Sequence, residues 1–309
     1  RLKRYGEAAD HVIAVLDKKA AEPRHAIESM YLLLRAERYR EADEHIPPEG
    51  APIFGSFLRA FARKGMGEPY LPVLESLEKA EGNVAEECDK YLNEIMSLFG
   101  KEDTGNWFVS AIADAQKAGL TSRTADIIQG RVYLSMERND DAEKVLLAAL
   151  EKYGSDPAIH YELAIVYDNL KRLPDTEKQL KEYLKVRPDD PEVLNFLGYL
   201  YADHNINLDE AERLLKHAVE LAPNNGYYLD SLAWVYYRRG QADKAIELIR
   251  KAILLMDNDD AEHAELRQHL GDAYLLKGDK EKAVAEWKHA EQLNPKLPGL
   301  REKIKQHQK

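Results

Sequence analysis

The sequence is poor in cysteine and contains no long apolar run. Its 309 residues include one cysteine, Cys88. A single thiol cannot close an internal disulfide, and it leaves no cluster of soft ligands for a structural zinc ion. No apolar run approaches the roughly 18–20 residues of a membrane-spanning helix, and no charged segment leads into an apolar signal region. We therefore expect no metal site and no transmembrane segment in this chain, and we interpret Cys88 as a buried small apolar residue.

An excess of positive charge is also missing. The chain has 44 basic and 55 acidic side chains, so its net charge is −11. Residues 1–122 carry 16 basic and 21 acidic side chains and residues 123–309 carry 28 and 34, which gives −5 and −6. A protein that follows nucleic-acid phosphates needs a basic face, so no nucleic-acid partner is expected. The 44% of hydrophobic and 32% of charged residues are typical of a folded protein.

The common signatures of enzymes are absent as well. The sequence has no glycine-rich phosphate loop, no HExxH, no GxSxG and no CxxC. Ten histidines are scattered along the chain, and we interpret them as surface or internally satisfied side chains. Glutamate pairs are interpreted as parts of solvated helix faces. The sequence therefore predicts no catalytic residue and no cofactor.

What the chain does contain is an internal repeat. Consecutive units begin 34, 34, 35 and 38 residues apart, at Arg123, Pro157, Pro191, Gly226 and Ala264. A period of this size indicates stacked supersecondary units. Each unit has two apolar stripes at helical spacing, separated by a polar turn. In the third unit the stripes are Leu194, Leu197, Gly198 and Tyr201, then Ala211, Leu214, Leu215 and Ala218. Each unit is therefore predicted to be a helix hairpin, and the chain to be all-α.

Local signals mark the ends of these helices. Asp156-Pro157 and Asp190-Pro191 place an N-cap acceptor before a proline at the first helical position. Gly240 and Gly278 lie in the expected turns between the two helices, where a left-handed backbone is easily adopted.

The units resemble tetratricopeptide repeats (TPRs). The last unit matches that pattern with Leu270, Gly271, Tyr274, Ala283, Trp287, Ala290 and Pro295. The resemblance implies a right-handed α-solenoid superhelix of helix hairpins. In such hairpins, small residues such as Gly198 allow two helices to approach closely.

The rest of the chain follows this frame less clearly. Residues 1–122 are interpreted as degenerate repeats, and residues 123–297 as five clear units. Tyr5–Ala8 are expected in the second helix of a truncated repeat, so we expect further residues, and any targeting signal, upstream of Arg1. Helix pairs are predicted within 23–46, 52–80 and 84–118, with Tyr39 and Ala42 in the second helix of the first pair. Residues 298–309 are predicted to form a capping helix.

In the family that these units resemble, the first helices line a concave groove. The resemblance implies that positions 2, 5, 6, 9, 12 and 13 of a unit point into it. These positions supply Tyr161, Asp168, Asn169, Asn195, Phe196, Tyr199, Asp203, Tyr227, Asp230, Trp234, Tyr237, Arg238, Gln268, His269 and Asp272. Six of these residues are aromatic, and aromatic side chains recur as hot spots at protein interfaces. The corresponding signature tyrosines Tyr201, Tyr236 and Tyr274 are assigned to the core instead.

Two familiar TPR grooves do not match these positions. The lysine, asparagine and arginine set of the chaperone-binding carboxylate clamp is absent. The asparagine ladder of O-GlcNAc transferase needs asparagine at position 6, which here holds Glu162, Phe196, Ser231 and His269.

Residues 191–297 resemble the C-terminal repeats of bacterial envelope TPR proteins. Many of those are outer-membrane lipoproteins, and some are adaptors for periplasmic proteases or assembly machines. The resemblance implies a non-enzymatic scaffold that holds a protein or peptide segment in its groove. It also implies a place at the periplasmic face of the outer membrane, with a lipid anchor upstream of Arg1. The alternatives are a cytoplasmic scaffold, a self-assembling scaffold, and the accessory repeat region of a larger enzyme such as a transferase.

Overall fold

The computed structural model describes residues 2–16, 23–44, 52–77, 84–255 and 263–307. Within these ranges every regular element is a helix, as the sequence predicts. None of the described helices is long and apolar enough to cross a bilayer. The chain divides into two compact units, Arg1–Gln179 and Leu180–Lys309, and each is described by itself. The division falls within helix α12 (Leu173–Val186), so the degenerate repeats and the first clear repeat both lie in the first unit.

The degenerate region of the first unit is helical in its described parts. Its helices are α1 (Leu2–Leu16), α2 (Pro23–Arg35), α3 (Tyr39–Glu44), α4 (Pro52–Gly65), α5 (Leu71–Ser76), α6 (Val84–Glu87), a π-helical turn (Cys88–Leu92), α7 (Asn93–Phe99) and α8 (Lys101–Lys117). Gly100, with φ 96°, separates α7 from α8. Aromatic side chains such as Tyr31, Phe57 and Phe108 are fully buried and stack on one another. Cys88 is buried as expected, and burial raises the pKa of its thiol.

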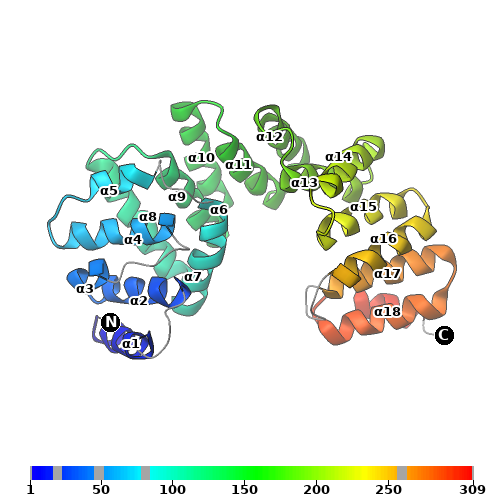
Figure 1. The fold of residues 1–309 in the computed structure, drawn as a ribbon, viewed down its shortest axis with the longest axis horizontal. Coiled ribbons are helices and arrows are strands. Elements are labelled where there is room, and N and C mark those ends of the chain that lie inside the picture. Colours follow the sequence, from blue (N-terminus) through cyan, green and yellow to red (C-terminus); the bar gives the residue numbers. More distant parts are fainter. Residues whose placement is uncertain (1, 17–22, 45–51, 78–83, 256–262, 308–309) are drawn as a thin grey trace. The chain divides into compact units, whose positions relative to one another are not determined.

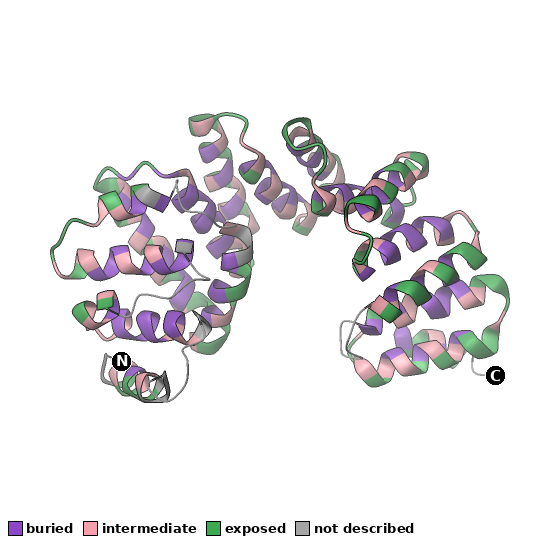
Figure 2. Ribbon diagram, viewed as in Figure 1, coloured by how far each residue is buried: buried purple, intermediate pink, exposed green. Residues whose placement is uncertain are grey.

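The regular repeats follow as pairs of helices of similar length. In the first unit these are α9 (Arg123–Ser135), α10 (Asn139–Tyr153) and α11 (Pro157–Asn169), with α12 crossing into the second. The second unit continues with α13 (Pro191–Asp203), α14 (Leu208–Leu221), α15 (Gly226–Arg238), α16 (Ala242–Leu255), α17 (His263–Lys277), α18 (Lys280–Leu293) and α19 (Leu300–His307). Figure 1 shows the successive hairpins, and Figure 2 shows buried residues alternating with exposed ones along their helices.

The caps and turns form as the local sequence indicates. The Asp190 carboxylate accepts hydrogen bonds from the Glu192 and Val193 amides at 3.1 and 3.3 Å. Gly240 and Gly278 have φ 73° and 91°. The third repeat has one more residue in its turn than its neighbours, and Asn205 and Asn207 adopt the left-handed backbone there (φ 54° and 47°). Asparagine tolerates this conformation better than most residues. Repeat length therefore varies in the turn and leaves both helices intact.

A buried ion pair in the first unit was not predicted. Arg131 on α9 donates from Nε to Oε1 of Glu162 on α11 at 2.7 Å, and both side chains are almost fully buried. Arg131 also donates to the exposed Asp89 at 2.6 Å. The interpretation of glutamates as solvated is wrong for Glu162. Its position 6 on a first helix faces the preceding repeat, where the Arg131 guanidinium supplies the counter-charge.

Helices α13 and α14 approach closely at Gly198. A Cβ atom built on Gly198 would lie 2.5 Å from Cγ of Leu215, closer than real side chains approach. Gly198→Val is therefore expected to lower the free energy of unfolding by about 1–3 kcal/mol, because the core must shift to admit the branched side chain. Urea denaturation followed by circular dichroism measures the change. Glu220→Val, at an exposed position on α14, is the control and should change stability by less than about 0.5 kcal/mol. Equal stability of Gly198→Val and the parent would contradict the helix packing.

Candidate functional site

Three first helices of the second unit lie side by side, because α13 contacts α15 and α15 contacts α17. We call their shared surface the α13–α15–α17 face. The three helices carry twelve of the predicted groove residues: Asn195, Phe196, Tyr199 and Asp203 on α13, Tyr227, Asp230, Trp234, Tyr237 and Arg238 on α15, and Gln268, His269 and Asp272 on α17. The remaining three, Tyr161, Asp168 and Asn169, lie on α11 in the first unit and are not part of this face.

Trp234 is the centre of a stack of flat side chains. Its ring stacks on Tyr237 with centroids 4.5 Å apart, and on His269 of the next repeat at 4.4 Å. The Arg238 guanidinium lies 4.9 Å from the Trp234 centroid, a cation–π distance. Helical spacing explains the contacts of Trp234 with Tyr237 and Arg238, because residues three and four apart share a helix face. The contact with His269 depends on tertiary packing, so the sequence could predict the residues and not the stack.

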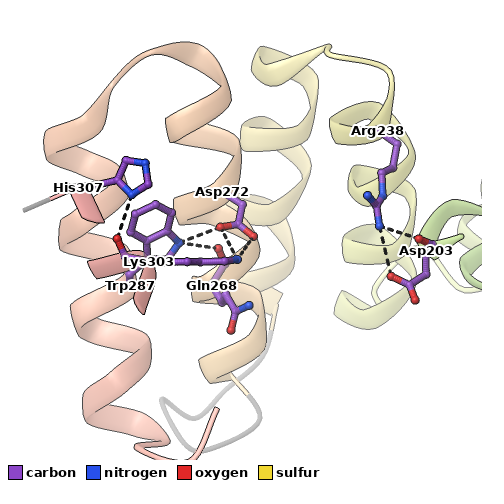
Figure 3. Close-up of polar contacts among 7 residues, drawn as sticks. All are labelled: Asp203, Arg238, Gln268, Asp272, Trp287, Lys303 and His307. Atoms are coloured by element: carbon purple, nitrogen blue, oxygen red, sulfur yellow. Dashed lines mark hydrogen bonds and ion pairs between the residues drawn. The ribbon is translucent and has the colours of Figure 1, made fainter. Parts of the chain in front are cut away.

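Two polar contacts tie the three helices together. The Arg238 Nη2 group donates to the main-chain carbonyl of Asp203 at 2.6 Å and lies 3.5 Å from its Oδ1, as Figure 3 shows. The Asp203 carbonyl belongs to the C-terminal end of α13, where a cation is favourable. Nδ1 of His269 lies 2.7 Å from Oδ2 of Asp230. Burial acts to lower the pKa of His269, but the charge and hydrogen bond of Asp230, together with the charges of Asp272 and Glu265, outweigh it, so this pKa lies above its ordinary value.

Tyr199 and Tyr227 are the exposed aromatic side chains of the face, at 36% and 45% exposure. Burial around its hydroxyl, and then the charges of Asp203, Asp230 and Glu265, raise the pKa of Tyr199 to about 12. Among the described residues, the Tyr199 hydroxyl has no hydrogen-bond partner. A large apolar ring with an unused polar end suits a protein interface.

Several polar atoms on this face are also unsatisfied. Oδ1 of Asn195, Oδ1 of Asp230, Nε1 of Trp234 and Nε of Arg238 are buried and have no hydrogen-bond partner within the described part of the chain. Buried polar groups are nearly always paired in native proteins, so four such atoms on one surface require an explanation. Their positions could not be found from the sequence, because they depend on which side chains the packing turns inward.

The edge of the face beside α19 differs from the expectation of an open groove. Asp272 is 7% exposed and accepts hydrogen bonds from Lys303 on α19 at 2.6 and 2.8 Å. Asp272 also accepts from Nε1 of Trp287 at 3.0 Å, and Trp287 approaches the Gln268 carbonyl at 3.3 Å (Figure 3). The structure therefore places Asp272 in the packing of the capping helix, which the sequence predicted without its contacts, and the Gln268 carbonyl against Trp287 of α18.

The predicted residues of the first unit are less concentrated. Tyr161 is half-buried, and Asn169 is exposed, with its Nδ2 group 3.5 Å from Oδ1 of Asn139. No group of three or more His, Cys, Asp or Glu side chains is placed to hold a metal ion in the described ranges. The α13–α15–α17 face is therefore the strongest candidate site in the described structure.

Comparison with known proteins agrees with this architecture. The family profile described as "Tetratricopeptide repeat" matches residues 110–299, more than half of the chain. A TPR repeat-containing protein of Pseudomonas aeruginosa is 30% identical over 141 residues, which are 45% of this chain and 23% of that protein. Interferon-induced protein with tetratricopeptide repeats 3 of Mus musculus is 30% identical over 131 residues, 40% of this chain and 32% of that protein. The chain thus spans less than a third of the length of either relative.

Solved structures support the fold. A tetratricopeptide repeat protein from Parabacteroides merdae superposes with a TM-score of 0.57 at 17% identity, covering 93% of this chain and 99% of that one. A thermophilic TPR protein from Thermus thermophilus superposes with a TM-score of 0.50 at 22% identity, covering 60% of this chain and 99% of that one. Together with the family match, these likenesses establish the solenoid of helix hairpins, and the chain belongs to the tetratricopeptide repeat family.

Proposed function

We propose that this chain is a non-enzymatic scaffold that holds a segment of a partner protein on the α13–α15–α17 face. Tetratricopeptide repeat proteins are generally protein-interaction scaffolds, and this chain belongs to that family. The observation that carries the proposal is the Trp234 stack, in which the buried indole Nε1 has no partner within the described residues. Tyr199 on α13 and Tyr227 on α15 are exposed and add further aromatic surface to these helices.

We further propose that the scaffold is a bacterial envelope adaptor at the periplasmic face of the outer membrane, serving a protease or an assembly machine. The resemblance of residues 191–297 to bacterial envelope TPR proteins supports this role. Fractionation of bacteria that express the complete reading frame tests the location. Recovery in the cytoplasmic fraction alone would refute it.

The double variant Trp234→Ala, Tyr199→Ala is expected to lose partner binding while keeping its helicity. Truncation of central aromatic anchors commonly costs 2 kcal/mol or more each, so affinity should fall by about 100-fold or more. The probe is a set of linear peptides selected from a random display library against the parent protein. Fluorescence anisotropy then measures their dissociation constants for the parent and the variant.

The matched control is Leu221→Ala, Leu254→Ala. Both leucines are exposed, at 44% and 84%, and lie on the second helices α14 and α16. This variant removes two large side chains from outside the proposed site, so it should bind like the parent. Unchanged binding by the Trp234, Tyr199 variant would exclude the face as the site, and sedimentation over a concentration series would then test self-assembly.

A further inference from the structure

Negative charge gathers around the Trp234 stack. Asp203 on α13 lies 3.5 Å from the Nη2 group of Arg238, which lies over the Trp234 ring. Asp230 on α15 lies 2.7 Å from His269, which stacks on Trp234. Glu265 lies four residues before His269 on α17, hence on the same side of that helix. Three carboxylates from three consecutive first helices therefore lie around this stack.

The chain itself leaves part of this charge without a counter-ion. Arg238 is committed to the carbonyl and carboxylate of Asp203, and His269 contacts one oxygen of Asp230. Glu265 is exposed and forms no ion pair among the described residues. The residue Asp230 is 8% exposed, and its Oδ1 has no hydrogen-bond partner there. This part of the face thus has an excess of acceptors and of negative charge.

A basic side chain has the chemistry that complements this surface. Guanidinium carries five N–H donors and ammonium carries three, and neither carries an acceptor. Both are attracted to the faces of aromatic rings, and guanidinium also stacks on them. An acidic side chain in the same place would face Asp203, Asp230 and Glu265, and juxtaposed like charges suppress association.

We propose that the α13–α15–α17 face selects partner segments that place an arginine or lysine side chain beside Glu265 and the Trp234 stack. The inference rests on the proposed function and specifies its partner as a protein segment with a basic anchor. The aromatic stack around Trp234 supplies affinity, and the carboxylates favour a positively charged side chain of the partner.

The test uses four mixtures of N-acetylated, C-amidated decapeptides that differ at one fixed central residue: arginine, lysine, glutamine or glutamate. All other positions are varied among uncharged residues, and blocked ends remove the terminal charges. The parent is expected to bind the arginine and lysine mixtures about tenfold more tightly than the glutamine mixture, and the glutamate mixture most weakly. This preference should shrink as salt is added, because the site is near the surface.

Charge reversal at Glu265 is the decisive variant. Glu265→Lys is expected to abolish the preference for basic residues and to improve binding of the glutamate mixture. Glu247→Lys, at an exposed position on the second helix α16, makes the same charge change away from the face and should leave the preference intact. Thermal melts of both variants confirm that each is folded.

The outcomes separate the two proposals. Equal affinity of the parent for all four mixtures, or an unchanged preference in Glu265→Lys, overturns the basic-anchor inference while the scaffold function stands. Binding that survives Trp234→Ala, Tyr199→Ala overturns the scaffold function on this face. No binding of any mixture to the parent, at concentrations that saturate the display-selected peptides, also overturns the basic-anchor inference.

Discussion

Arg131→Met is expected to lower the free energy of unfolding by about 3–5 kcal/mol, because it leaves the Glu162 carboxylate buried without its Arg131 counter-charge. The Glu162 side chain is 2% exposed, so water cannot replace the guanidinium without opening the packing between α9 and α11. Equilibrium urea denaturation monitored by circular dichroism measures the loss. Because the described structure divides into two compact units, the transition of the first unit is the one to follow.

Two further variants identify the cause of that loss. Arg131→Met combined with Glu162→Leu removes both charges and should recover most of the stability, since apolar replacements of a buried pair are often neutral or better. Asp89 is the second partner of Arg131, and its side chain is 65% exposed. Asp89→Asn should therefore lower the free energy of unfolding by less than about 1 kcal/mol. A double variant as unstable as Arg131→Met would show that side-chain volume, and not charge, explains the loss.

Trp287→Ala is expected to lower the free energy of unfolding by about 3–5 kcal/mol, the usual cost of deleting a buried indole. Trp287 is fully buried, and a Cβ atom on Gly271 would lie only 2.4 Å from its ring, so the indole fills the space that the glycine leaves. The same indole lies beneath α19, where Lys303 and His307 approach its ring (Figure 3). Amide hydrogen exchange of α19 should therefore rise together with the loss of global stability.

Trp287→Phe is the matched control for this variant. Phenylalanine keeps most of the buried ring and loses the hydrogen bond from Nε1 to Asp272, so it should cost less than the alanine variant. If α19 exchanged at the parent rate in Trp287→Ala, the cap would be held by contacts other than this indole.

The helices of the regular repeats could be predicted closely because their signals are local. Asp156 and Asp190 precede helices that begin at Pro157 and Pro191, and each carboxylate accepts from the first amides, as an N-cap should. The last repeat begins at His263, one residue before the predicted Ala264. The degenerate repeats offered no such caps in sequence, and their helices are defined instead by aromatic packing around Tyr31 and Phe108.

The candidate site could be predicted in part. Spacing places Trp234, Tyr237 and Arg238 on one side of α15, because side-chain direction in a helix repeats every three to four residues. Nothing local distinguishes Asp230, which pairs with His269, from Asp272, which pairs with Lys303 of the cap. Those partners lie 39 and 31 residues away in the chain, so the pairing depends on how successive hairpins stack.

The sequence by itself determined the repeat, the helix hairpins, their caps and turns, and the set of first-helix residues, since these follow from periodicities of 3.6 and about 34 residues. Only the tertiary structure decided which of these residues remain available to a partner. It paired Arg131 with Glu162, placed Asp272 beneath the capping helix, and left Tyr199 exposed. The physical reason is that burial and electrostatic pairing depend on distances between helices, and those distances are set by the packing of whole side chains.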